Sequence, residues 1–327
     1  MISLKPFGEL DISGVKGELI MKKYTMIFSI LMLVLVLTAC SSGGNIEFQY
    51  GNVTNNQIDH IHGAGYINGE NNVVIATHTG LYSYGEEGWK EASSQKHDYM
   101  GFQAVNDGFF ASGHPGQGSD LENPFGLIKS TDKGASFENL AFYGEIDFHY
   151  LAAGYNTNTI YVFNEMPTEN LNGGLHYSTD EGKNWTSSAL SGFDSSYISN
   201  FATHPTKSEL LVVGSKDGLY ISEDFGQNVV KFNSASMISY VTLTESGGYY
   251  TNFDDSYVYL KSFTFDSANE KEILLPEEIM KDPIILIASN PNNNEEITIV
   301  TNNLNIYLTK DHGLNWEKLA SNGELTK

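Results

Sequence analysis

The stretch Ser178-Thr179-Asp180-Glu181-Gly182-Lys183-Asn184-Trp185 recurs along this 327-residue chain and decides how the rest of it is interpreted. Its Ser and Asp side chains can accept hydrogen bonds from backbone N–H groups within the turn. Gly182 supplies the positive φ of a tight turn, and Trp185 returns into the next strand. The pattern S-x-D-x-G-x-N-W therefore predicts a β-hairpin that is pinned by its own side chains.

Three further copies follow the same pattern, and one of them has Val229 in place of the aromatic residue. We expect the residues of all four copies to be structural. The three further copies are Ser130, Asp132, Gly134, Ser136 and Phe137; Ser222, Asp224, Gly226 and Asn228; and Thr309, Asp311, Gly313, Asn315 and Trp316.

The spacing of these turns predicts the architecture. Their aspartates are 48, 44 and 87 residues apart, and the last interval is close to two periods. A degenerate unit is therefore expected at 257–274. A period of about 45 residues has room for four short strands, which is typical of a propeller blade. The expected blades are roughly 58–93, 97–141, 146–190, 196–235, 238–275 and 283–320.

Runs of β-branched and aromatic residues separated by Gly, Asn and Asp turns fill most of the chain, so the fold class is all-β. We expect a six-bladed β-propeller in which Asn45–Val53 adds a strand that closes the ring against the last blade. A seven-bladed propeller is the alternative, if Asn45–Val53 belongs to a poorly marked blade.

The four turns resemble the Asp-box (BNR) repeats of sialidase-like and sortilin-like propellers, whose members are often labelled glycosyl hydrolases. The resemblance implies a propeller over residues 46–322 and places the boxes on its outer rim, away from the central channel. It also implies two kinds of function, glycoside hydrolysis and the binding of protein partners.

The N-terminal segment has the features of a bacterial lipoprotein signal. Lys22 and Lys23 precede an apolar run, and Leu37-Thr38-Ala39-Cys40 resembles the lipobox, in which the cysteine is lipidated. We interpret residues 1–20 as a mis-assigned start, 21–39 as the signal peptide and 40–45 as lipidated Cys40 with a tether. The protein is therefore expected outside the cytoplasm, anchored to the bacterial cell membrane by its lipid.

Charge excludes two functions. The net charge is −22 and the chain contains no arginine. A polyanion of this kind does not bind nucleic acid by neutralising phosphates. A sialidase of the resembled family clamps its substrate carboxylate with three arginines, and lysine lacks their planar, bidentate fork. Sialidase activity is therefore rejected.

Histidines gather near the start of the predicted innermost strands of blades 1 to 3. Side chains two residues apart on a strand point the same way, so His60 is expected beside His62 and Asp147 beside His149. Imidazole suits zinc and copper, and a thioether favours copper(I). The predicted metal ligands are His60, His62, His78, His97, Met100, His114 and His149, with copper or zinc as the ion.

Two alternatives to metal binding at this channel mouth remain open. A glycosidase of non-sialidase type would use paired carboxylates, for which Asp98, Asp147 and Glu165 are the candidates. A scaffold would bind a protein or glycan there, through surface aromatics such as Tyr99 or Phe102 or through the loops 114–124 and 165–173. No catalytic motif such as G-x-S-x-G is present, so the sequence favours binding over catalysis.

Overall fold

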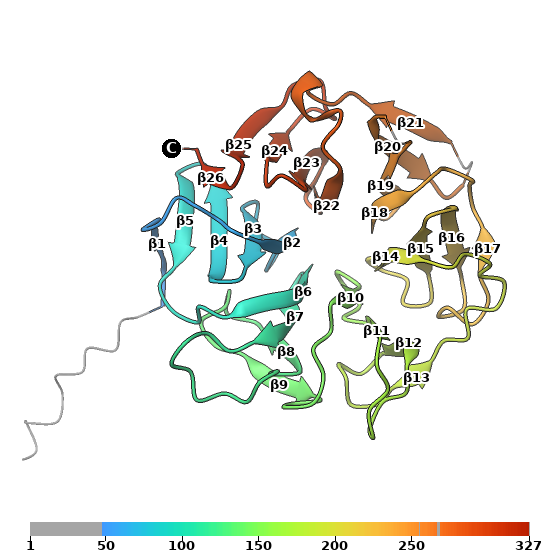
Figure 1. The fold of residues 1–327 in the computed structure, drawn as a ribbon, viewed down its shortest axis with the longest axis horizontal. Coiled ribbons are helices and arrows are strands. Elements are labelled where there is room, and N and C mark those ends of the chain that lie inside the picture. The colour runs from blue at the N-terminus through green and yellow to red at the C-terminus, as the bar shows by residue number, and fades with distance from the viewer. Residues whose placement is uncertain (1–47, 255, 267–268, 327) are drawn as a thin grey trace, which may run out of the picture. The chain divides into compact units, whose positions relative to one another are not determined.

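A computed structural model describes residues 48–254, 256–266 and 269–326 of the chain (Figure 1). These residues belong to one compact unit that begins at Phe48. The predicted start at Met21, the signal peptide and the lipidation of Cys40 lie outside the described residues. Within them, no helix is long and apolar enough to cross a bilayer.

The described residues form six antiparallel sheets, in each of which four main strands pair in chain order; one sheet gains a further strand from the start of the described chain. Blade 1 contains β2 (Ile61–Tyr66), β3 (Val73–Thr77), β4 (Gly80–Gly85) and β5 (Gly88–Ala92). Blade 2 contains β6 (Asp98–Val105), β7 (Gly108–His114), β8 (Leu127–Ser130) and β9 (Glu138–Ala141). Blade 3 contains β10 (Tyr150–Ala153), β11 (Ile160–Asn164), β12 (Gly174–Ser178) and β13 (Thr186–Ser187).

The second half of the ring repeats this arrangement. Blade 4 contains β14 (Ile198–Thr203), β15 (Leu211–Ser215), β16 (Gly218–Ser222) and β17 (Val230–Lys231). Blade 5 contains β18 (Ile238–Leu243), β19 (Gly247–Phe253), β20 (Val258–Thr264) and β21 (Glu270–Ile273), followed by the short 3₁₀ helix η1 (Glu277–Ile279). Blade 6 contains β22 (Ile284–Asn290), β23 (Asn293–Thr301), β24 (Ile306–Thr309), β25 (Glu317–Ser321) and β26 (Glu324–Leu325).

The first strand of each blade lies nearest the axis of the ring (Figure 1). These strands contact one another in the order β2, β6, β10, β14, β18, β22, and β22 contacts β2 again. The predicted six-bladed β-propeller is therefore confirmed, and the seven-bladed alternative is wrong. The interfaces between blades are packed with buried apolar side chains, and Tyr99, Phe102, Phe109 and Phe110 lie in this core rather than on the surface.

The predicted role of Asn45–Val53 is wrong in one respect. The strand β1 (Tyr50–Asn52) pairs with β5 on the outer edge of blade 1, not with the last blade. Two contacts hold it there: the hydroxyl of Tyr50 donates to the carbonyl of Lys133, and the carboxylate of Glu91 accepts from the backbone of Thr54. These groups favour the edge of blade 1.

The two ends of the described chain close the ring instead. The backbone N–H of Ile58 donates to the carbonyl of Gly323 over 2.8 Å, and that of Leu325 donates to Asn56 over 2.8 Å. The indole of Trp89 in blade 1 donates to the carbonyl of Leu319 in blade 6. Blades 1 and 6 are thus joined by backbone hydrogen bonds between segments about as far apart as the described sequence allows.

The four recurring turns have the hydrogen bonds that their sequence predicts. In the turn that begins at Ser178, its hydroxyl accepts from the backbone of Gly182 over 2.8 Å, and Asp180 accepts from the backbone of Asn184 over 2.9 Å. The other three turns repeat both bonds. All four glycines have positive φ, between 77° and 93°. Each turn joins the third and fourth strands of its blade, counted from the axis, so it supports the scaffold and not the mouth.

Candidate metal centre

Three histidines come together where β2 and β3 pair at the mouth of the channel. His60 precedes β2, His62 lies on it, and His78 follows β3. The rings are stacked with His78 in the middle: its centroid is 4.5 Å from that of His60 and 4.5 Å from that of His62. One nitrogen atom of each ring lies within 4.8 Å of the other two, and no other group of histidine or acidic side chains among the described residues is found this close together.

A bulge in the sheet directs His62 into the channel. Ile61 pairs with Thr77 and Gly63 with Ala76, so His62 is an extra residue without a partner on β3. The inner strands of blades 2, 4, 5 and 6 shift register at the same level. The residues at these shifts line one cavity of about 280 Å³ together with His149 of blade 3; they are His62, Gly101, Phe102, Ser199, Ser239 and Ile285.

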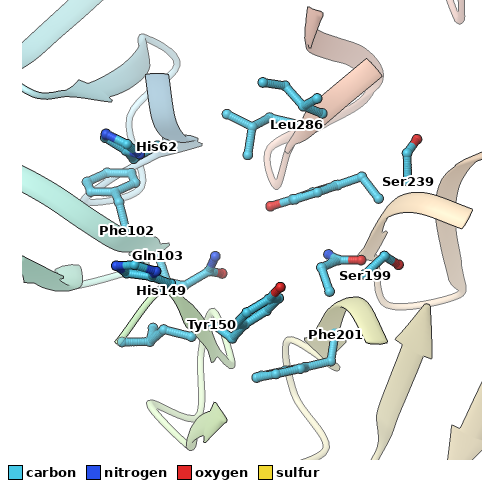
Figure 2. Close-up of a pocket in the computed structure, with 14 residues that line it drawn as sticks. His62, Phe102, Gln103, His149, Tyr150, Ser199, Phe201, Ser239 and Leu286 are labelled. Atoms are coloured by element: carbon cyan, nitrogen blue, oxygen red, sulfur yellow. The ribbon is translucent and has the colours of Figure 1, made fainter. Parts of the chain in front are cut away.

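Figure 2 shows these side chains around the cavity, with His62 and His149 on the side of blades 1 to 3 and Ser199 and Ser239 across from them. A second cavity, of about 340 Å³, is lined by the opposite ends of the inner strands. Gln103 and Tyr240 line both cavities and therefore lie between them.

Asp98 lies beside the three histidines on β6. Its two carboxylate oxygens are 3.4 Å from Nε2 of His62 and 3.8 Å from Nε2 of His78. Both Nε2 of His62 and Oδ1 of Asp98 are buried, yet neither has a hydrogen-bond partner among the described residues. Buried polar atoms without partners are rare in native proteins, so two of them facing each other call for an explanation.

Burial also affects protonation here. Desolvation, followed by the neighbouring rings of His78 and His60, lowers the pKa of His62 to about 4. Desolvation raises the pKa of Asp98. His62 is therefore a neutral imidazole at neutral pH, which is the form that binds metal ions.

A second group of side chains lies next to the first and contains Asp147, His114 and His149. Oδ2 of Asp147 is 2.7 Å from Nε2 of His149 and 3.1 Å from Nε2 of His114. The hydrogen bond with Asp147 raises the pKa of His149. Asp147 and His149 both act electrostatically on His62 and on Asp98, so the two groups share one channel mouth.

The structure brings together five of the seven predicted metal ligands: His60, His62 and His78 in one group, and His114 and His149 in the other. His97 does not join them. It is 6% exposed, its Nδ1 accepts from the backbone of Gly116, and its Nε2 pairs with Gln95. The reason is alternation along the chain, since His97 precedes Asp98 by one residue and faces the aromatic core.

Met100 is the other predicted ligand that does not join the site, because the register shift in blade 2 places Gly101 and Phe102 at the position equivalent to His62. Met100 is not among the residues that line the cavity. Of the carboxylate candidates, Asp98 and Asp147 lie in the two groups, and Glu165 is 3.9 Å from Nδ1 of His149.

One residue of the site was missed. Asn123 accepts a hydrogen bond from Nδ1 of His114 over 2.6 Å. It lies in the loop between β7 and β8 that the sequence marks as longer than a hairpin needs. The length of that loop was the available signal, but it did not single out this side chain.

Comparison with known proteins supports the fold. No model of a known protein family and no curated protein matches the sequence. Among solved structures, the chain is similar to a GH74 xyloglucanase from Xanthomonas campestris, with 16% identity, a TM-score of 0.53 and coverage of 84% of this chain. It spans 47% of that enzyme, about half its length.

Two other solved structures are similar to the same degree. A GH74 enzyme from Niastella koreensis has 14% identity and a TM-score of 0.54 over 83% of this chain and 47% of its own. The tricorn protease has 11% identity and a TM-score of 0.56 over 82% of this chain and 26% of its own. At these identities the similarity establishes a propeller fold and no activity.

Proposed function

We propose that this protein is a lipid-anchored, extracytoplasmic β-propeller that binds a zinc or copper ion through His60, His62 and His78. The observation that carries the proposal is the convergence of three imidazole nitrogens within 4.8 Å of one another. Imidazole is the ligand that zinc and copper share, and three histidines with a further open position form a common zinc-binding arrangement.

Asp98 is proposed as an additional ligand of this ion. Two ligand atoms that are each about 2.1 Å from one ion, at tetrahedral to octahedral angles, lie about 3.0–3.4 Å apart. The observed 3.4 Å between His62 and Asp98 falls in this range, although the two atoms form no hydrogen bond with each other. An ion between them would satisfy both of these unpartnered atoms.

The glycosidase alternative has less support. Asp98 and Asp147 lie at the same mouth, but each has a histidine nitrogen within 3.4 Å. Carboxylates in this setting are better suited to holding cations than to acting as a free acid and nucleophile. Hydrolysis of xyloglucan or another glucan that is lost in both Asp98→Asn and Asp147→Asn, with metal analysis negative, would favour the enzyme instead.

Membrane anchoring is proposed from the sequence alone, through Cys40, the single cysteine of the chain. The wild-type chain, expressed in a bacterium, should fractionate with the membrane and incorporate labelled fatty acid. Cys40→Ser should do neither. Equal labelling of the two would contradict the anchor.

The relationship of the four turns to Asp-box repeats is likewise our proposal, supported by their shared sequence. A protein or glycan partner at the channel mouth is best sought by crosslinking on intact cells.

Metal binding is tested on protein purified without chelators, by elemental analysis and by calorimetric titration with Zn²⁺ and with Cu²⁺. We expect bound metal at stoichiometric level, and affinity at this site at least tenfold weaker in His60→Ala/His78→Ala. His312→Asn is the matched control: His312 is exposed, lies in the fourth turn and has φ of 54°, which asparagine tolerates. Absence of bound metal together with absence of binding heat would refute the proposal.

A further inference from the structure

The second cavity, at the opposite end of the inner strands from the three histidines, is kept open by small side chains. Each of the six inner strands contributes a small residue to its wall, an alanine in five of them and a threonine in the other. Larger side chains at this level, where six strands converge on one axis, would fill the space. The six residues are Ala64, Ala104, Ala153, Ala202, Thr242 and Ala288.

The rim of this cavity is held by hydrogen bonds that join each blade to the next. Such a bond is present at all six joints between blades, so the rim is fixed before any ligand arrives. A fixed rim loses little conformational freedom on binding, which favours affinity. The bonds run from Asn68 N to Val105 O (3.2 Å), from Asn106 N to Tyr155 O (2.8 Å), from Asn156 N to Pro205 O (2.8 Å), between His204 Nε2 and Glu245 O (3.1 Å), from the Tyr249 hydroxyl to Asn294 O (3.0 Å), and from Asn292 Nδ2 to Gly69 O (2.9 Å).

Many polar side chains of the cavity remain available to a ligand. The bonds of the rim use the backbone of Asn106 and Asn156, while their side-chain amides form no hydrogen bond among the described residues. Each amide can donate two hydrogen bonds and accept others. The hydroxyl of Tyr155, which also lines the cavity, is buried and has no well-aligned partner there. The other lining side chains without such a bond include Thr242, Thr244, Ser246, Ser289 and Asn294.

The charge of the lining indicates the class of ligand. Glu245 is the one charged residue among those that line the cavity, and no lysine or histidine joins it. An anionic ligand would therefore meet no cation here, in a chain whose net charge is −22. The hydroxyls of a sugar both donate and accept hydrogen bonds, as amide and hydroxyl side chains do. Its C–H faces can pack against apolar surface such as Leu243, Ile287 and the ring of Tyr240, which line the same cavity.

We propose that this second cavity binds a neutral saccharide of one or two rings. Its volume of about 340 Å³ is at the lower end of the range of about 300–1,000 Å³ for small-molecule sites, which limits the ligand to this size. The amides of Asn106 and Asn156 would bond to sugar hydroxyls, and the carboxylate of Glu245 would accept from others. The site uses none of the histidines, so the inference goes beyond the proposed function and stands without it.

The experiment is calorimetric titration of the whole protein with neutral sugars: glucose, galactose, xylose, N-acetylglucosamine, cellobiose, lactose and xylobiose. At least one should bind with a Kd of about 1 mM or tighter. Glucuronic and galacturonic acid, which differ from glucose and galactose in having a carboxylate in place of the primary alcohol, should not bind. This comparison needs no variant, so it holds whether or not any substitution disturbs folding.

Variants then locate the bound sugar. Asn106→Ala/Asn156→Ala should weaken its binding by at least about tenfold, because hydrogen bonds from two amides are lost. Both side chains are exposed and unbonded, so the Tm should stay unchanged. Asn302→Ala is the matched control: Asn302 is exposed in the turn between β23 and β24 and should leave the affinity as it is. His60→Ala/His78→Ala should also bind the sugar normally.

Three outcomes would overturn the inference. The first is that none of the neutral sugars binds, and the second is that the uronic acids bind as well as their neutral counterparts. The third is a sugar whose affinity survives in Asn106→Ala/Asn156→Ala, because it would then bind elsewhere. None of these outcomes affects the metal site, and failure of metal binding would leave this cavity as proposed.

Discussion

Replacing His62 with phenylalanine should make the metal-free propeller more stable and at the same time abolish its stabilisation by metal. Nε2 of His62 is buried without a hydrogen-bond partner, and its ring is stacked on His78 with 16° between the ring planes. A phenyl ring retains the flat shape and the stack but brings no polar atom. The side chain would thus pack at least as well in the same position.

Two opposing contributions set the size of this gain in the free energy of unfolding. A buried polar atom without a partner costs about 1–3 kcal/mol, and part of any gain is lost because the phenyl ring is slightly larger, so we expect a net gain of about 1 kcal/mol. For a domain of this size that raises Tm by about 2–4 °C. Zinc at 100 times its Kd should stabilise the wild type by about 2.7 kcal/mol and the variant hardly at all. The order of the two proteins should therefore reverse when zinc is added.

The assay is thermal and urea unfolding of both proteins, each with chelator and with excess zinc. His78→Phe is the control, because the side chain of His78 is 42% exposed and has no buried unpartnered atom. It should lose the effect of zinc without a gain in the metal-free state. Destabilisation of metal-free His62→Phe by more than about 1 kcal/mol would refute the assignment of His62 as a residue kept for binding at the expense of stability.

Three other predictions concern the scaffold. Leu325→Ala should lower the free energy of unfolding by about 2–3 kcal/mol in urea, because Leu325 is buried where blades 1 and 6 meet. The control Val230→Ala, on an exposed edge, should change it by less than about 0.5 kcal/mol. Gly313→Ala should lower Tm more than Gly88→Ala does. Both glycines have positive φ, but a Cβ added at Gly313 would lie 2.3 Å from Cγ2 of Ile273, whereas one added at Gly88 would meet no atom within 4 Å. Equal losses of Tm would contradict this prediction. Hydrogen bonds from the side chain and backbone of Asn184 hold the pKa of Asp180 at about 2, below its ordinary value of 3.8. In urea unfolding, the stability advantage of the wild type over Asp180→Asn should therefore be complete above pH 3.8 and disappear as the pH falls through about 2. An advantage that does not change with pH would refute this prediction.

The blades were predictable from the sequence because each turn is stabilised by residues within seven positions of one another. Ser178, Asp180 and Gly182 specify their hairpin without help from the rest of the chain. The position of β1 was not predictable in this way. Two edges were available to it, and the choice depends on contacts with Glu91 and Lys133, about 40 and 80 residues away.

The candidate site was predicted in part for the same reason. The period of two along a strand placed His60 with His62 and Asp147 with His149, and the pairing of neighbouring strands added His78. The bulges were not predictable, since a register shift has no clear signal in this sequence, and the shift in blade 2 is what moves Met100 away from the cavity. The role of Asn123 depends on the path of a long loop, which local patterns do not determine.

The attachment of β1 has a mechanical consequence. This strand lies outside the hydrogen bonds that join the first and last blades, and it pairs with β5 over only three residues. Tension applied to the chain ahead of Phe48 would therefore strip this short ladder from the edge before any load reached Ile58 and Gly323. The detachment of β1 would therefore absorb the first part of the applied force, and the hydrogen bonds that close the ring would stay intact.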